Sequence, residues 1–69
     1  MPFPIENCES IRETDKAILV ESEFFEDYDD DGHMWIPKSQ IHDDSEIWKV
    51  SQKGDLVVSS WFAEQKGWL

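Results

Sequence analysis

Residues 16–25 read Lys-Ala-Ile-Leu-Val-Glu-Ser-Glu-Phe-Phe, and this stretch predicts the first β-strand of the fold. It opens with a run of aliphatic residues and then alternates, so one face carries Ile18, Val20, Ser22 and Phe24. A second short strand is predicted over residues 33–37, His-Met-Trp-Ile-Pro, which the proline ends or confines to a sheet edge. Residues 26–32 between them are rich in Asp and close with glycine, a composition typical of turns. The two strands are therefore expected to form a hairpin connected by an acidic loop.

The rest of the chain predicts a second hairpin and a short helix. Its expected elements are a helical turn or tight loop over 38–44, a third strand over 45–51, a turn over 52–55 and a fourth strand over 56–58. Ser59 or Ser60 can cap a terminal helix over residues 61–66, which Gly67 ends.

Residues 1–14 contain two prolines and no clear periodicity, so they are interpreted as an extended or poorly ordered N-terminal arm. Residues 15–69 then form a single small domain. The predicted fold class is α+β, with a small antiparallel sheet of about four strands in two hairpins and a short C-terminal helix.

Charge is concentrated in the predicted loop between the first two strands. The chain of 69 residues has a net charge of -10, with 16 Asp and Glu against 6 Lys and Arg. Seven carboxylates lie within residues 21–31, with no lysine or arginine among them: Glu21, Glu23, Glu26, Asp27, Asp29, Asp30 and Asp31. Direct nucleic-acid binding and attraction to an anionic membrane are both disfavoured, because each requires clustered basic residues. A basic protein surface is the partner that such a cluster fits.

The single cysteine, Cys8, excludes an intramolecular disulfide and a zinc site built on four thiolates. The N-terminal residues have no basic segment followed by an apolar run, so neither a signal peptide nor a membrane span is expected. These features predict a cytoplasmic protein.

A calcium site is the alternative use of the acidic loop. Residues 27–32, Asp-Tyr-Asp-Asp-Asp-Gly, match the first half of the EF-hand loop pattern, with Asp27, Asp29 and Asp31 as the alternating ligands. The position of the bidentate glutamate is occupied by Lys38, and the flanking segments predict strands rather than helices. A looser loop site for a hard cation stays open, and a solvated loop is the simpler interpretation. His33 and His42, nine residues apart, match no established ligand spacing.

An enzyme is not predicted, and no cofactor is expected. The sequence has no nucleophile elbow, no glycine-rich phosphate loop and no paired base. Glu6 and Glu9 flank Cys8, and their charges are expected to raise the pKa of its thiol and oppose reactivity.

The aromatic residues divide between core and surface. Trp35, Trp48 and Trp61 fall inside predicted elements and are expected in the core. Trp68 lies beyond the helix end and either folds back onto the core or forms an apolar contact for a partner or a second copy. Phe24, Phe25 and Tyr28 lie among the carboxylates, where aromatic rings suit a basic, partly apolar groove; the simpler reading is that Phe24 faces inward.

From Lys16 onward the chain resembles a group of short, standalone proteins encoded by bacteria and their phages, a group whose activity is uncharacterised. The resemblance is carried by residues 17–21, the segment Trp35-Ile-Pro-Lys-Ser-Gln-Ile41, residues 45–48, and residues 56–67 with Trp-Phe-Ala-Glu-Gln-Lys-Gly. It implies a small product of a phage or mobile element, and it transfers no site residue. Residues 24–31 are richer in acids than the shorter connection usual in the group.

The sequence predicts a small acidic interaction protein that inhibits a host nucleic-acid-binding or defence protein, such as a CRISPR effector, by occupying a basic groove as a DNA mimic. The expected partner-binding residues are Glu21, Glu23, Glu26, Asp27, Tyr28, Asp29, Asp30 and Asp31. Two alternatives stay open: a calcium-binding or structural module that uses the Asp27–Asp31 loop, and a housekeeping domain, with a homodimer through Trp68 as a candidate arrangement.

Overall fold

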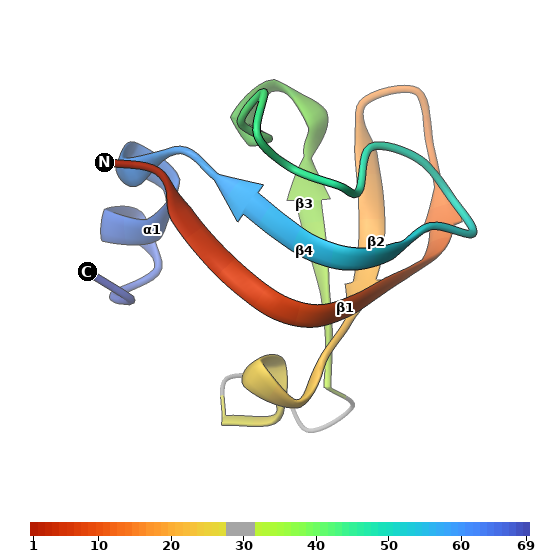
Figure 1. Cartoon of the computed structure of the whole chain (residues 1–69), viewed down its shortest axis with the longest axis horizontal. Helices are drawn as coiled ribbons and strands as arrows, with labels where there is room; N and C mark the ends of the chain where they lie inside the picture. Colours follow the sequence, from red (N-terminus) through yellow and green to blue (C-terminus); the bar gives the residue numbers. More distant parts are fainter. Residues whose placement is uncertain (28–31) are drawn as a thin grey trace.

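The computed structural model describes residues 1–27 and 32–69 of the chain and shows a four-stranded antiparallel sheet with one short C-terminal helix (Figure 1). The elements in chain order are β1 (Phe3–Glu13), β2 (Ala17–Glu21), the 3-10 helix η1 (Glu23–Asp27), β3 (His33–Pro37), the 3-10 helix η2 (Lys38–Gln40), β4 (Lys53–Val58) and α1 (Ser60–Gln65). The strand order across the sheet is β3-β2-β1-β4. The predicted fold class is therefore confirmed.

The predicted β2–β3 hairpin is confirmed, and the structure gives its register. Ile18 lies opposite Ile36 and Leu19 opposite Trp35. The first strand ends at Glu21, four residues earlier than predicted. The turn is made by Ser22, whose hydroxyl accepts a hydrogen bond from the Phe24 N–H (3.3 Å) and whose carbonyl accepts one from the Phe25 N–H (3.0 Å). Such local bonding competes with the strand ladder, so residues 23–27 form η1 instead.

The interpretation of residues 1–14 as an arm outside the domain is wrong. Residues 3–13 form β1, which lies between β2 and β4 in the middle of the sheet. Two irregularities hide the strand in the sequence: the register shifts between Ile5 and Cys8 and again between Ser10 and Arg12. Asn7 adopts a positive φ of 56° at the first shift, a conformation that asparagine tolerates better than most residues. Each shift resets the alternation, so the period of two is lost although the strand is continuous.

The predicted third strand over residues 45–51 is also wrong, and with it the predicted second hairpin. This segment is a loop that forms no strand ladder, and several of its backbone groups bond to side chains. The Gln52 side-chain oxygen accepts hydrogen bonds from the N–H groups of Trp48 (2.6 Å) and Lys49 (2.9 Å). The buried Ser45 hydroxyl accepts from Ile47 N–H (3.2 Å) and donates to the Ile47 carbonyl (3.0 Å). The predicted fourth strand exists as β4, but it pairs with β1.

Residues 41–46 cover the outer edge of β4. Ile41 forms an isolated antiparallel bridge with Val58. The His42 N–H donates to the Val57 carbonyl (2.8 Å), and the Glu46 N–H donates to the Asp55 carbonyl (2.9 Å). Gly54 lies in β4 with a φ of 142°, and a Cβ at this position would lie 2.8 Å from the Glu46 Oε1 atom. A glycine is therefore required where the loop crosses the strand.

The terminal helix forms as predicted. Ser59 caps α1, its hydroxyl accepting a hydrogen bond from the Phe62 N–H (3.1 Å), and Gly67 follows the helix with a φ of 79°. The chain then folds back, so the ring centroid of Trp68 lies 5.8 Å from that of Phe3 and 5.1 Å from that of Phe24. Of the two alternatives for Trp68, packing onto the core is the one observed.

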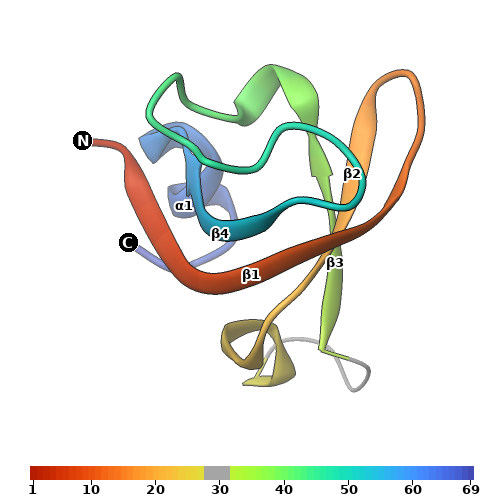
Figure 2. The same cartoon turned by 45° about the vertical axis from the view of Figure 1, so that its right-hand side comes forward.

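The core lies on the concave face of the curved sheet and is mainly aliphatic (Figure 2). Its fully buried side chains include Ile18, Ile36, Leu56 and Phe25. The prediction that three tryptophans belong to the core is wrong: Trp35, Trp48 and Trp61 are 46%, 39% and 56% exposed. Burial follows the side of the sheet on which a side chain lies, and Trp35 alternates with Ile36 onto the opposite side.

Candidate protein-binding surface

Four charged or titratable side chains form one row across the outer face of the sheet. Glu9 of β1 lies opposite Glu21 of β2; Glu21 in turn lies opposite His33 of β3, and Glu9 opposite Lys53 of β4. Side chains directly opposite one another on paired strands lie on the same face. The register therefore places two carboxylates side by side in the middle of the row, with one basic side chain at each end.

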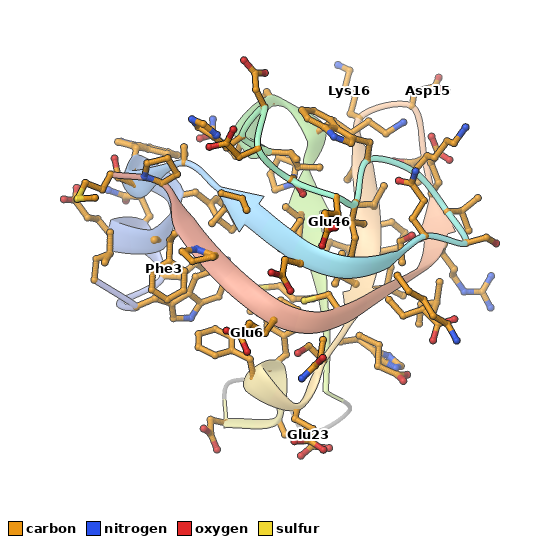
Figure 3. All side chains as sticks on the ribbon, in the orientation of Figure 1. Phe3, Glu6, Asp15, Lys16, Glu23 and Glu46 are labelled. Carbon is orange, nitrogen blue, oxygen red and sulfur yellow. The ribbon has the colours of Figure 1, made fainter. Side chains whose placement is uncertain are left out.

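Two further carboxylates from η1 extend this row into an acidic surface, defined here as Glu9, Glu21, Glu23 and Glu26. The four side chains line one open hollow of about 600 Å³, and Lys53 is the basic residue among its described lining. Figure 3 shows Glu23 on η1, at the end of the molecule opposite the β1–β2 turn with Asp15 and Lys16. The described part of the acidic surface thus gathers at one end of the β2–β3 hairpin.

The acidic surface is held in place against its own repulsion. Like charges directly opposite each other on neighbouring strands destabilise a sheet, and Glu9 and Glu21 are such a pair. His33 relieves part of the repulsion, since its Nε2 atom lies 2.9 Å from the Glu21 Oε2 atom. The side chains of His33 and Glu21 are 33% and 54% exposed, so both are open to a partner.

The sequence-predicted residues are partly brought together. Glu21 ends β2 and Glu23, Glu26 and Asp27 lie on η1; all four are exposed. The predicted site residues Tyr28, Asp29, Asp30 and Asp31 lie outside the described residues. For the calcium alternative, Asp27 is described, whereas Asp29 and Asp31 are not. Within residues 1–27 and 32–69, no three His, Cys, Asp or Glu side chains converge in a manner that would hold a metal ion. His33 begins β3, whereas His42 follows η2 and its N–H donates to the Val57 carbonyl of β4.

Sequence reasoning missed Glu9 and Lys53, which belong to the row only through the pairing of β1. No pattern in the sequence pointed to them, because the two bulges interrupt the alternation that would identify β1 as a strand. The two phenylalanines proposed for the surface pack inward instead: Phe25 is fully buried, and Phe24 contacts Phe3 and Trp68.

The outer face becomes apolar and mixed in charge toward the other end of the hairpin. Leu19 lies opposite both Trp35 and Arg12, one row beyond Glu21 on the same face. A second, shallower hollow is lined here by Ile11, Arg12, Glu13, Thr14, Asp15, Trp35, Lys38 and Val50. Trp35 is thus the exposed aromatic ring of this face, next to the acidic surface.

Cys8 takes no part in either hollow as a reactive group. Its thiol is buried and donates to the Ile5 carbonyl over 3.3 Å. Burial is the main cause that raises its pKa, with a further contribution from Asp55 and an opposing one from Ser22. The predicted direction agrees with this, but burial and Asp55 replace Glu6 and Glu9 as its causes.

Comparison of the chain with protein-family models, with curated proteins and with solved structures gave no match. Among the described residues, no helix has the length and apolar character that crossing a membrane requires.

Proposed function

We propose that this protein is an acidic binding protein that occupies a basic, nucleic-acid-binding groove of another protein. The observation that carries the proposal is the in-register pair Glu9 and Glu21, extended by Glu23 and Glu26 around one hollow. An arrangement that destabilises the free protein persists when a partner gains from it. A groove lined with Arg and Lys is such a partner, because it neutralises the carboxylates on binding.

The surface has the features of a phosphate track. Neighbouring strands lie about 4.8 Å apart, so the charges of Glu9 and Glu21 follow one another at a spacing that successive basic side chains of a groove can match. Trp35, one row away on the same face, offers a ring on which an arginine can stack while it pairs with a carboxylate. In the sequence, three further carboxylates, at residues 29–31, follow η1, and they lie outside the described residues.

The proposed biological role is stoichiometric inhibition of a host defence nuclease, such as a CRISPR effector, in the bacterial cytoplasm. Support comes from the small size, the net charge of -10 and the resemblance to short phage-encoded proteins. Inhibition requires no catalytic group, in keeping with the buried, protonated state that burial favours for Cys8. Complementary charge would speed association and make the complex sensitive to salt.

The test is capture from a lysate of the host with the immobilised protein, followed by elution with salt or with duplex DNA. The test variant carries Glu9→Gln, Glu21→Gln and Glu23→Gln. The matched control carries Asp43→Asn, Asp44→Asn and Glu64→Gln, which removes the same charge from exposed positions elsewhere. We expect the wild type and the control to retain a nucleic-acid-binding protein that duplex DNA displaces, and the test variant to lose it.

Equal capture by the test variant and the control would contradict the proposal, because net charge alone would then explain binding. A captured protein that resists both salt and duplex DNA would contradict it as well.

A further inference from the structure

The two outer strands of the sheet differ in whether another segment covers their free edges. The edge of β4 is covered by residues 41–46, as described above. The other edge belongs to β3, whose sequence, His-Met-Trp-Ile-Pro, contains no permanently charged side chain. Exposed apolar edge strands are templates for pairing with another chain unless charge or coverage protects them.

The hairpin register shows which backbone groups of β3 face outward. The Ser22 N–H donates to the Gly32 carbonyl (3.1 Å), and the Lys38 N–H donates to the Lys16 carbonyl (2.8 Å). Because hydrogen-bonded pairs alternate along an antiparallel ladder, Met34 and Ile36 bond to β2. His33, Trp35 and Pro37 therefore direct their backbone groups away from the sheet.

The outward groups of β3 comprise two donors and three acceptors, since Pro37 has no N–H. Within the described residues, no other strand bonds to the outward groups of His33 and Trp35. The Pro37 carbonyl, at the N-cap of η2, accepts the first bond of that turn and keeps a second lone pair for a partner. Backbone groups that have no partner within a protein are almost always exposed to water, so the outward groups of His33 and Trp35 face solvent.

We infer that a second copy of this chain pairs with this edge, antiparallel and two-fold symmetric about Trp35, to give a continuous eight-stranded sheet. In this register the Trp35 N–H of each copy donates to the Trp35 carbonyl of the other. The His33 N–H of each copy donates to the Pro37 carbonyl of the other. All four outward N–H groups of the two edges are then bonded, and the missing donor of proline leaves no N–H without an acceptor. This inference does not rest on the proposed function, although both use the exposed ring of Trp35.

The charges favour this register over its neighbours. The acidic surface lies at the His33 end of β3, whereas Lys16 and Lys38 lie at the Pro37 end, where Lys38 is paired with Glu13. Antiparallel pairing centred on Trp35 keeps the two acidic ends apart and places each of them beside the mixed-charge end of the other copy, with its lysines. A register centred on Met34 would bring the two acidic ends closer together, and one centred on Ile36 would lose the His33 donors.

Trp35 supplies the side-chain contact of the interface. Its ring is 46% exposed on the outer face beside Leu19, and the two-fold axis would pass between the Trp35 residues of the two copies. Tryptophan at the centre of a contact is a frequent energetic anchor of interfaces. The covered edge of β4 offers no equivalent site.

Sedimentation equilibrium of the full chain, over protein concentrations up to about 1 mM, measures the association directly. The variants are Trp35→Lys and Trp35→Glu, each alone and then mixed in equal amounts. Like charges at the two-fold position repel, so we expect each variant alone to associate at least about fivefold more weakly than the wild type. The equimolar mixture should recover association, because only a residue that meets its own copy is rescued in this way.

Proton exchange of single amides, followed by NMR, tests the register within the same protein. With rising protein concentration, exchange of the Trp35 and His33 amides should slow, while the Met34 and Ile36 amides, already bonded to β2, serve as internal controls. A wild type that stays monomeric throughout overturns the inference. So does association that both charged variants retain, or that the mixture fails to recover while melting curves show both variants folded.

Discussion

The connection between β2 and β3 and the segment between η2 and β4 both leave the sheet, but they use carboxylates in opposite ways. In the segment that covers β4, the Glu46 side chain accepts a hydrogen bond from the Asp55 N–H (2.9 Å). Glu13 at the end of β1 accepts one from the Val50 N–H (3.2 Å) and pairs with the Lys38 ammonium (2.5 Å). Around η1, by contrast, Glu21 pairs with His33 and with no other residue in 1–27 and 32–69, and Glu23, Glu26 and Asp27 are exposed.

The difference shows where this small protein uses charge for stability and where it leaves charge for another purpose. Carboxylates that accept backbone N–H groups fix a loop that has no strand ladder of its own. Carboxylates that face one another across β1 and β2 weaken the fold. The acidic end is then anchored by an apolar side chain, Phe25, rather than by its polar groups.

The largest effect is expected from the anchor of the acidic end. Phe25 is fully buried, and Phe25→Ala should lower the free energy of unfolding by about 3–5 kcal/mol, because it leaves a cavity beneath η1. The control is Trp61→Ala, which removes an exposed aromatic ring and should change stability by about 0.5 kcal/mol or less. Urea denaturation measures both. Similar losses for the two variants would show that η1 does not depend on Phe25.

The anchor of the covering segment should have the next largest effect. Ser45→Ala removes a buried hydroxyl that accepts from the N–H groups of Ile47 (3.2 Å) and Val57 (3.1 Å), and leaves both without this acceptor. We expect a loss of about 1–3 kcal/mol in urea denaturation. Ser39→Ala, at an exposed position of η2, is the matched control and should be close to neutral. If the two serines behave alike, hydroxyl bonding does not hold the segment.

A smaller, pH-dependent effect is expected at Glu13. The hydrogen bond from Lys38, and after it the one from Val50, lowers the pKa of the Glu13 carboxyl below its usual 4.5. A lowered pKa stabilises the fold above the unfolded value, and this contribution disappears as the pH falls through the folded value. Glu13→Gln should therefore destabilise the protein at pH 7 and approach the wild type below about pH 4.

Melting curves of the wild type and Glu13→Gln at pH 7, 5 and 3.5 test this expectation. A difference in melting temperature that is the same at all three values would assign the effect to packing rather than to ionisation.

The smallest effect should come from the acidic surface, and its sign should be opposite. Glu23→Gln removes one of four carboxylates around the hollow, so the melting temperature should rise by about 1–3 °C. Added salt should reduce the difference, because it screens the repulsion in the wild type. Glu64→Gln on α1, away from the hollow, is the control for net charge. A lower melting temperature for Glu23→Gln would show that this glutamate supports η1.

The sequence was sufficient where local chemistry determines the structure. Alternation in residues 17–21 and 33–37 predicted the β2–β3 hairpin, and the serine and glycine at the ends of α1 predicted its limits. The acidic residues lie between these two strands in the sequence, and this was enough to predict that they gather at one end of the hairpin. Each of these features depends on neighbours a few residues away.

The failures have two different physical causes, one local and one that involves distant segments. Residues 45–51 alternate like a strand, but the side chains of Ser45 and Gln52 bind the backbone groups that a ladder would use. β1 lacks alternation because Asn7 and a second bulge reset it, and it is a strand only because β2 and β4 both pair with it. With β1 unrecognised, the Glu9–Glu21 pair could not be predicted.

The central position of β1 also has a consequence for the order of events during synthesis. Phe3 pairs with Val58, so β1 leaves the ribosome well before its partner β4 and must wait for it before the sheet is complete. The β2–β3 hairpin needs only local pairing and can form much earlier, whereas contacts this distant in sequence slow folding. We therefore expect the β1–β4 pairing to be the late, rate-limiting event, which cannot begin before β4 has been translated.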